Sequence, residues 1–192
     1  MTSSAAIVPP GGRRRQVIEV AAGLFAARGF HGVSMHEIGE AVGVSGPALY
    51  KHFAGKEALL GAMLVDISER LLHEGARRSA AARTDGPAAE LAALVQWHVE
   101  FALTEPALIT VQFRDLASLG DDDRATVRRL QRRYVEIWTA AIQAATGVDA
   151  AHARSSAHAV FGLINSTPHS ARLDAAEMAT LLERMALAAL LA

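Results

Sequence analysis

The stretch from Ser34 to Lys56 constrains the fold more than any other part of the chain, because it predicts two short helices joined by a tight turn. Ser34 followed three residues later by Glu37 is the capping-box pattern that begins a helix. Apolar residues then recur at helical spacing as far as Gly43, a residue typical of a helix end. Ser45 is the next expected N-cap. This arrangement predicts a helix-turn-helix, whose second helix enters the major groove of DNA.

A first helix, expected over Arg14–Arg28 and ended by Gly29, should support these two helices by packing its apolar face against theirs. Gly39 is unusual because Gly inside a helix costs roughly 1 kcal/mol relative to Ala, and a close approach of the first helix is one explanation. The expected three-helix core comprises Val17, Ile18, Ala21, Leu24, Phe25, Ile38, Val42, Leu49 and Phe53.

The segments LFAARGFHGVS, IGEAVGVS and ALYKHFAGKEALL follow one another here with fixed spacing and no gaps. From about Arg14 to Leu60 the chain therefore resembles the DNA-binding domain of the TetR family of bacterial transcriptional regulators. The remaining residues resemble that family only in length and helical character. The resemblance implies an all-α fold, with an N-terminal helix-turn-helix domain joined by a long helix to a C-terminal helical domain that binds a ligand and dimerises.

Matching the motif residue by residue implies a set of contacts to the sugar-phosphate backbone of DNA. Lys51 is the residue of the second helix with the reach and the donors for a guanine edge. At the start of that helix, Gly46, Pro47 and Ala48 stand where family members often carry longer polar residues, so they offer only shape or methyl contacts and direct readout should be sparse. The implied backbone contacts are Ser34, Ser45, Tyr50, His52 and Lys56.

Arg13, Arg14 and Arg15 stand where the first helix is expected to begin, and two interpretations stay open. They begin a solvated helix, or they form a basic arm that meets phosphates or reaches a minor groove. Three cations at a helix N-terminus oppose the helix dipole, a cost that DNA phosphates would offset, and this favours the arm. Residues 1–12 are expected to be a disordered tail, 13–55 the DNA-binding domain and 56–192 the ligand-binding and dimerisation domain.

Beyond the helix-turn-helix, helical periodicity, caps and breaks predict further helices, with a loop over Asn165–Leu173. Asp174 with Glu177 is a second capping-box pattern. The arginines Arg128, Arg129, Arg132 and Arg133 are interpreted as an ordinary solvated face. The expected helices run from Lys56 to about Ser79, Pro87 to Leu103, Pro106 to Leu119, Asp121 to Thr146, Asp149 to Ile164, and Asp174 to the end.

The last two helices carry more apolar surface than one small domain needs, which predicts a four-helix dimer interface. The alternative is that these residues complete the core of a single chain. The predicted interface residues are Ala157, Val160, Phe161, Ile164, Met178, Leu181, Leu182, Met185 and Ala189.

The C-terminal half also offers aromatic side chains for an apolar ligand and a few polar groups to orient it, although each of these residues could equally be ordinary core or surface. Arg114 would suit an anionic or acyl-thioester-like ligand. By the resemblance, the ligand would shift the long helix and so the separation of the two reading helices in the dimer. The candidates are Trp97, Phe101, Phe113, Arg114, Tyr134, Trp138, His158 and Asn165.

Composition excludes several other classes. The chain has 192 residues, no Cys and a net charge of −1, so any DNA-binding charge must be concentrated locally. We expect a cytoplasmic protein, because no apolar stretch reaches the roughly 18 residues of a membrane span. No enzyme fingerprint is present, and we expect no cofactor and no metal, because the histidines are dispersed. The preferred function is a dimeric repressor of a palindromic operator, released by a small-molecule effector; the alternative is a helical protein-interaction adaptor.

Overall fold

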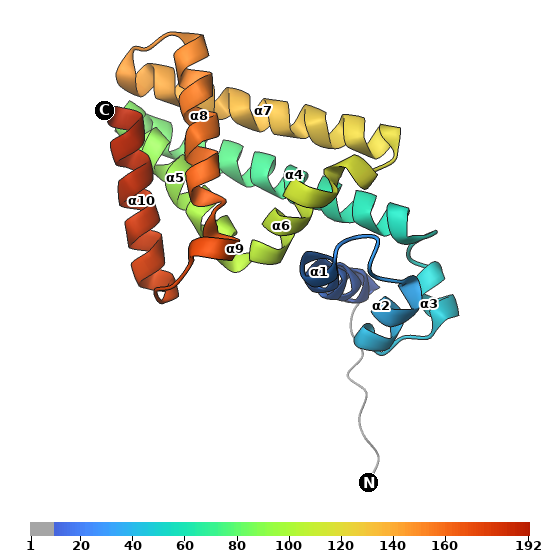
Figure 1. The fold of residues 1–192 in the computed structure, drawn as a ribbon. Helices are drawn as coiled ribbons and strands as arrows, with labels where there is room; N and C mark the ends of the chain where they lie inside the picture. The colour runs from blue at the N-terminus through green and yellow to red at the C-terminus, as the bar shows by residue number, and fades with distance from the viewer. Residues whose placement is uncertain (1–9) are drawn as a thin grey trace.

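The computed structural model describes residues 10–192, which form ten α-helices and two short 3-10 turns and contain no strand (Figure 1). The predicted all-α class is therefore confirmed. The 3-10 turns are η1, Arg83–Asp85, and η2, Leu116–Ser118. The helices are α1 Pro10–Arg28, α2 Met35–Val42, α3 Gly46–Tyr50, α4 Lys56–Ala82, α5 Pro87–Thr104, α6 Pro106–Asp115, α7 Asp121–Thr146, α8 Ala150–Ile164, α9 Thr167–Ser170 and α10 Ala175–Leu191.

The first three helices form a small unit at one end of the molecule (Figure 1). Val17 and Phe25 of α1 are fully buried against Ile38 of α2 and Leu49 of α3, as the apolar spacing predicts. Burial of this shared face holds α3 in place, because five residues are too few for a helix that is stable by itself.

Both ends of α2 follow the predicted local chemistry. The Ser34 hydroxyl accepts the Glu37 amide, and the Glu37 carboxylate accepts the Ser34 amide at 2.7 Å, which completes the capping box. Gly43 ends the helix with φ of 72°, a left-handed conformation that favours Gly. A Cβ at Gly39 would lie 3.2 Å from the Val44 carbonyl oxygen. The close contact that explains this glycine is therefore with the turn after α2, and not with the first helix as the sequence analysis suggested.

The long helix α4 belongs to both halves, since it begins beside the three-helix unit and then runs along α7 (Figure 1). Its fully buried residues Leu59, Leu64 and Ile67 recur at helical spacing and form one apolar stripe. Gly75 allows α7 to come close, because a Cβ there would lie only 2.5 Å from Cε2 of Tyr134. At the other end of the molecule, α8 and α10 pack on α5 and α7.

Several predicted boundaries were wrong. Pro10–Gly12 belong to α1, because Pro suits the first turn of a helix, whereas residues 1–9 of the predicted tail lie outside the described residues. Helix α6 ends at Asp115, four residues before the predicted end, and the chain continues as η2. The expected loop over Asn165–Leu173 contains the one-turn helix α9. Asp174 caps α10 as predicted, through bonds from the Ala176 and Glu177 amides.

Most of the predicted dimer-interface residues were also assigned wrongly. Five of the nine are buried in the core of the single chain, at 5% exposure or less, so the alternative that they complete that core holds for them. Helices α8 and α10 turn these side chains towards α5 and α7, which a sequence pattern cannot distinguish from a face turned towards a second copy. The five are Ala157, Val160, Ile164, Met178 and Leu182. Phe161 is half-buried and faces the cavity described below.

Candidate DNA-reading surface and ligand cavity

Helix α3 turns its polar side outwards. Leu49 is fully buried, whereas Tyr50 is 55% exposed and the next two residues, Lys51 and His52, are also exposed. Pro47 lies in the first turn, as predicted. Ser45 is the residue before the helix, but its side chain makes no capping hydrogen bond, so the predicted cap is present only in its backbone. Ser45 is itself exposed.

The neighbouring polar residues have structural bonds of their own. Lys56 donates to the Val33 carbonyl at 2.9 Å, and its ammonium lies 4.5 Å from the centre of the Phe30 ring. Hydrogen bonds from Ser34, with a further bond from Arg28, hold the pKa of the Glu37 carboxyl at about 2. These contacts fix the segment before α2 and the start of α4, where the motif implies phosphate contacts.

The three consecutive arginines lie on α1, so they begin a helix, as the first interpretation has it. Their contact with DNA phosphates stays a prediction. Arg13 donates to Gln16 at 3.1 Å, and Arg15 pairs with Glu19 at 2.8 Å. The Arg14 guanidinium lies 5.1 Å from the Phe53 ring, just beyond the reading helix. Arg14 is thus the arginine of the three that the fold brings next to the reading helix.

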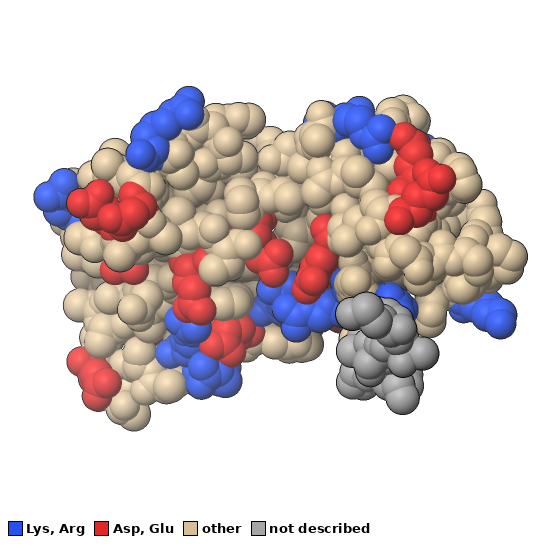
Figure 2. Space-filling view, turned by 90° about the horizontal axis from the view of Figure 1, so that it is seen from below, with Lys and Arg blue, Asp and Glu red and all other residues tan. Residues whose placement is uncertain are grey.

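Charge on the molecule is mixed. Figure 2 shows one face, on which Lys and Arg side chains alternate with Asp and Glu over a largely uncharged surface. This agrees with the net charge of −1. A local concentration of cations for DNA stays a prediction.

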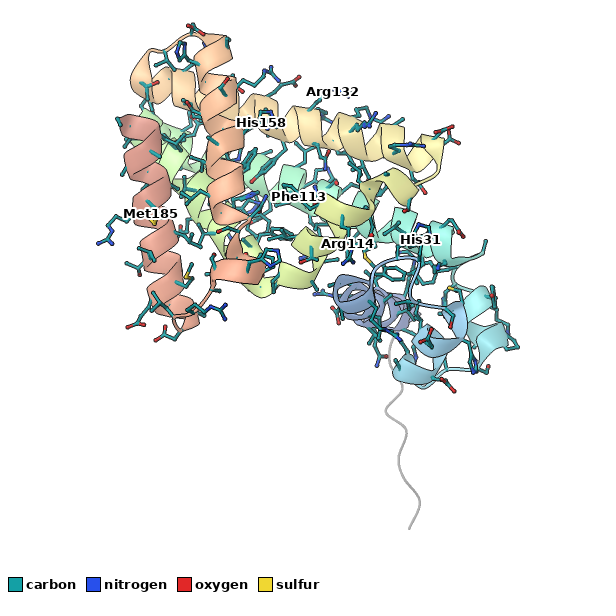
Figure 3. All side chains as sticks on the ribbon, in the orientation of Figure 1. His31, Phe113, Arg114, Arg132, His158 and Met185 are labelled. Carbon is teal, nitrogen blue, oxygen red and sulfur yellow. The ribbon has the colours of Figure 1, made fainter. Side chains whose placement is uncertain are left out.

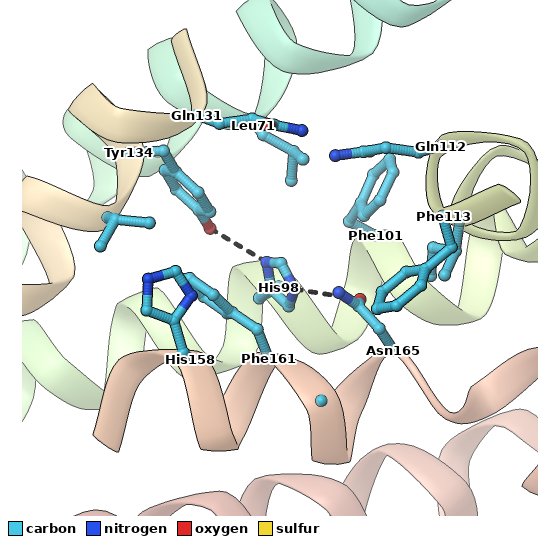
Figure 4. Close-up of a pocket in the computed structure, with 13 residues that line it drawn as sticks. Leu71, His98, Phe101, Gln112, Phe113, Gln131, Tyr134, His158, Phe161 and Asn165 are labelled. Atoms are coloured by element: carbon cyan, nitrogen blue, oxygen red, sulfur yellow. Dashed lines mark hydrogen bonds between the residues drawn. The ribbon is translucent and has the colours of Figure 1, made fainter. Parts of the chain in front are cut away.

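The C-terminal half contains a cavity of about 290 Å³ between α4, α5, α6, α7 and α8 (Figure 4). Its wall is mainly apolar and aromatic, with amide, imidazole and phenol groups at intervals. Helices far apart in the sequence therefore supply one site of the kind that holds small molecules. The lining residues are Leu71, His98, Phe101, Ile109, Gln112, Phe113, Gln131, Tyr134, Val135, His158, Phe161, Gly162 and Asn165.

His98 is the polar centre of the cavity wall (Figure 4). Its Nε2 lies 3.2 Å from the amide oxygen of Asn165, and its Nδ1 lies 3.2 Å from the Tyr134 hydroxyl. Burial lowers the pKa of His98 to about 4, so the ring is neutral near pH 7. Because an amide oxygen only accepts, Nε2 carries the proton and Nδ1 accepts from Tyr134. Burial also raises the pKa of Tyr134, which keeps the phenol protonated for this role.

The cavity brings together five of the eight predicted ligand residues: Phe101, Phe113, Tyr134, His158 and Asn165. The two tryptophans were assigned wrongly. Trp138 is fully buried behind the cavity, edge-on to Phe161, and Trp97 donates its Nε1–H to the Leu71 carbonyl at 3.3 Å. His98 was not among the predicted ligand residues; an imidazole within an otherwise apolar stripe of α5 was the available signal.

Arg114 connects the two halves of the molecule and does not line this cavity. Its guanidinium donates to the carbonyls of Phe25 and Ala26, in the last turn of α1, with a distance of 3.2 Å to Ala26. A cation suits the carbonyl end of a helix. Asp115, which is 5% exposed, pairs with Arg114 at 3.1 Å, and this bond raises the pKa of Arg114. Figure 3 shows Arg114 between α6 and α1, with Phe113 beside it.

Two family models match the chain. Residues 17–63 match the model of bacterial regulatory proteins of the tetR family, and residues 84–190 match a tetracyclin repressor-like C-terminal domain. The chain belongs to the TetR family. This family consists of bacterial regulatory proteins that bind DNA, and its members are not enzymes. The expected membership of the TetR family and the expected all-α fold are both confirmed.

Known relatives agree with this membership. The transcriptional repressor KstR2 of Rhodococcus jostii is 28% identical over 134 residues, which are 69% of this chain and 65%, or less than two thirds, of that protein. A TetR-family regulator from Bordetella parapertussis has the same fold, with a TM-score of 0.82, 24% identity and 93% of each chain covered. AibR, solved with isovaleryl coenzyme A and operator DNA, has a TM-score of 0.74 at 23% identity and covers 90% and 97% of the two chains.

Two further observations concern the described residues alone. Within residues 10–192, no helix combines the length and the apolar character that crossing a bilayer requires. The same part of the chain holds no group of three or more His, Asp or Glu side chains placed to bind a metal ion.

Proposed function

We propose that this TetR regulator is a repressor that binds a palindromic operator as a dimer and is released from it by a small-molecule effector. One observation carries the proposal. The helix that forms one wall of the cavity, α6, carries Arg114 in its last turn, and the Arg114 guanidinium bonds the carbonyls of Phe25 and Ala26 in α1. Helix α6 thus joins the cavity to the DNA-binding unit, because it lines the cavity and its Arg114 is hydrogen-bonded to α1.

This connection supports a simple mechanism of release. Phe113, which precedes Arg114, is 77% exposed and lines the cavity, so a ligand that fills the cavity meets α6 directly. Movement of α6 would move the end of α1 through Arg114. Two reading helices of a dimer meet successive major grooves only when they lie about 34–36 Å apart. A ligand that favours another separation lowers the affinity for DNA by linkage.

The outer side of the last helix supports a dimer. Met185 of α10 is 43% exposed and points away from the molecule (Figure 3), and Ala189 is exposed one turn later. Leu181, one turn before, is half-buried. These three are the predicted interface residues that are neither buried in the core of the single chain nor turned to the cavity. They lie on one stripe of α10 because they are four residues apart. We propose that this stripe packs against the same stripe of a second copy.

The relatives support the two remaining parts of the proposal. KstR2 of Rhodococcus jostii is a repressor, which favours repression over activation here. AibR was solved with isovaleryl coenzyme A and operator DNA, and FadR of Bacillus subtilis with stearoyl coenzyme A. Both neighbours have this chain's fold, so a C-terminal half that takes up a small metabolite fits the proposal.

The test is selection of bound fragments from random duplex DNA by the purified protein, at two salt concentrations. We expect one palindromic sequence to be enriched, with an affinity that falls as salt rises because phosphate contacts release counterions. Lys51→Ala should weaken binding to that sequence by about 1–3 kcal/mol. Arg129→Ala, an exposed residue of α7, is the control and should bind normally.

The selected site then serves for a release experiment, in which metabolites are added to the complex of the protein with labelled DNA. A compound that binds the protein and releases the DNA supports the effector part of the proposal. If no sequence is enriched even at low salt, the repressor proposal fails and the adaptor alternative is favoured. If enriched DNA stays bound when a compound fills the cavity, release by that site is excluded.

A further inference from the structure

A second hollow adjoins the cavity at the surface between α7 and α8, and it is called the α7–α8 hollow below. It has a volume of about 190 Å³, and three of its lining residues also line the cavity: Gln131, Val135 and His158. Its other lining residues are all arginines, namely Arg128, Arg132 and Arg154. A ligand group at this end of the cavity therefore lies beside three guanidinium groups.

Helical spacing places the arginines next to the cavity wall. Arg154 precedes His158 by four residues, so the two lie on one face of α8. On α7, Arg128 precedes Gln131 by three residues and stands one turn before it. Figure 3 shows Arg132 and His158 on these two neighbouring helices. The cationic hollow thus begins within one helical turn of the cavity wall.

The α7–α8 hollow has no acidic side chain to balance its arginines. A hollow between α4 and α5 also has three arginines, but Glu74 and Glu100 line it with them. Each of those arginines is ion-paired: Arg70, Arg77 and Arg78. Within residues 10–192, the three arginines of the α7–α8 hollow make no ion pair. Three like charges around one hollow repel one another, and an anion between them replaces this repulsion by attraction.

The cavity itself suits an uncharged, flat group. None of its thirteen lining residues is Asp, Glu, Lys or Arg, so an ionised group buried there without a partner would cost a large desolvation free energy. The rings of Tyr134 and Phe161 lie nearly parallel, at 10° and 5.8 Å between centres, and His98 stacks on Tyr134. Such a wall favours an aromatic ligand body that stacks on it.

We propose that the cavity and the α7–α8 hollow together bind a compact aromatic monocarboxylate, with its ring in the cavity and its carboxylate on Arg128, Arg132 and Arg154. The inference rests on the proposed function and names the ligand class of the same site. Guanidinium groups bind a carboxylate with two hydrogen bonds at once. Because the arginines directly adjoin Gln131 and His158, the carboxylate is attached to the ring itself or through a short linker.

The size of the cavity agrees with a compact ligand. At about 30 Å³ for each water-sized group, its volume of about 290 Å³ holds roughly ten such groups, which suits one ring system with a short linker. The proposal also gives Arg128 and Arg132 a role beyond the ordinary solvated face that the sequence indicates.

Arg114 does not perform this role, although the sequence favoured it for an anionic or acyl-thioester-like ligand. Its guanidinium is already bonded to Asp115 and to two carbonyls of α1. The anion-binding groups are instead supplied by α7 and α8.

The test is calorimetric titration of the full chain with three matched pairs of acid and amide, at low and high salt. The pairs are phenylacetate with phenylacetamide, trans-cinnamate with cinnamamide, and 2-naphthoate with 2-naphthamide. The two members of a pair share one ring system and nearly one size, so their difference in affinity isolates the charge. We expect at least one acid to bind wild type at least about tenfold more tightly than its amide, and high salt should reduce this preference.

The decisive variants are Arg128→Ala/Arg132→Ala and the matched control Arg129→Ala/Arg133→Ala, which removes two arginines one residue further along the same helix. The first variant should abolish the preference for the acid, and the control should change it less than about twofold. Arg154→Ala should weaken the acid in the same direction as the first variant. The amides should bind all these proteins equally, which shows that the variants are folded and that the cavity is intact.

Equal affinity of acid and amide in all three pairs overturns the inference, and so does an equal loss of acid binding in the two double variants. If an amide binds and releases the selected operator while no acid binds more tightly, the inference is wrong and the proposed function stands. If an acid binds in the expected pattern while the operator stays bound, the inference stands and release through this site fails. If no compound binds while the operator is bound, the inference is wrong and DNA recognition alone remains.

Discussion

The DNA-binding half and the C-terminal half hold their polar groups in different ways. In the first, Ser34 bonds Glu37 three residues away, and both partners are at the surface. In the second, His98 bonds Tyr134 and Asn165, which are 36 and 67 residues away, inside the core. Local caps therefore shape the reading surface, whereas contacts between distant segments shape the cavity. An amino-acid substitution in the C-terminal half should therefore disturb the ligand site more readily than a substitution in the DNA-binding half disturbs the reading helix.

The largest expected effect comes from breaking the core of the DNA-binding half. Leu49→Ala removes a fully buried side chain, which typically costs 2–5 kcal/mol. Operator binding should be lost. Urea unfolding followed by circular dichroism should shift strongly, whereas fluorescence of Trp97 and Trp138, both in the C-terminal half, should shift less. Equal shifts of the two signals would show that the two halves unfold as one unit, which would contradict the difference between them described above.

The next effect depends on pH and belongs to the C-terminal half. The pKa of His98 is about 4 in the folded chain and about 6.5 when the ring is free, so the unfolded state binds more protons between these values. The free energy of unfolding should therefore fall as pH falls from 6.5 to 4, by up to about 3 kcal/mol.

His98→Gln should abolish this loss, and His73→Gln, an exposed residue of α4, should retain it. The measurement is urea unfolding of the three proteins from pH 7.5 to pH 5, a range above the region where the Glu37 carboxyl, with a pKa of about 2, begins to contribute. An unchanged pH dependence in His98→Gln would assign the acid sensitivity to another group.

A pair of glycine substitutions, one in each half, should change stability by an intermediate amount and in opposite directions. Gly75→Ala forces a methyl group against the Tyr134 ring and should destabilise the protein by about 1–3 kcal/mol. Gly23→Ala, in the exposed part of α1, has nothing within 4 Å of the new methyl and should stabilise by about 0.5–1 kcal/mol. Thermal unfolding measures whether each variant is more or less stable than the wild type. Stabilisation by Gly75→Ala would contradict the packing given for α4 against α7, and destabilisation by Gly23→Ala would contradict the open surroundings given for Gly23.

The smallest expected effect is local to the reading surface. Ser34→Ala removes the cap of α2 and should cost about 1 kcal/mol. Ser45→Ala is the matched control, because the Ser45 side chain makes no capping bond and its loss should leave the thermal midpoint nearly unchanged. Equal loss of stability in the two variants would show that Ser45 has a structural bond after all.

The sequence was sufficient wherever structure depends on near neighbours. The capping box of Ser34 and Glu37, the left-handed Gly43 and the apolar stripe of α4 all follow from spacing and residue type, and the structure confirms them. The reading helix with its exposed Lys51 follows in the same way. These features require only local hydrogen bonds and helical periodicity.

Features that depend on distant contacts could not be predicted. An apolar stripe shows that Val160 and Leu182 are buried, but it does not show whether the cover is the same chain or a second copy. Aromatic residues were reasonable cavity candidates, yet Trp138 lies behind the wall and His98 within it. The orientation of each helix about its axis decides these cases, and that orientation depends on all its neighbours together.

The bond between Arg114 and α1 is made to main-chain oxygens of Phe25 and Ala26, and this has a consequence for mutational tolerance. Every residue type supplies the same carbonyl, so the two positions can change without loss of the acceptor as long as the last turn of α1 keeps its shape. Sequence drift in the DNA-binding half is thereby uncoupled from the connection to the C-terminal half. A DNA-binding half with different DNA specificity could therefore replace this one, and Arg114 would still bond the carbonyls in the last turn of its first helix.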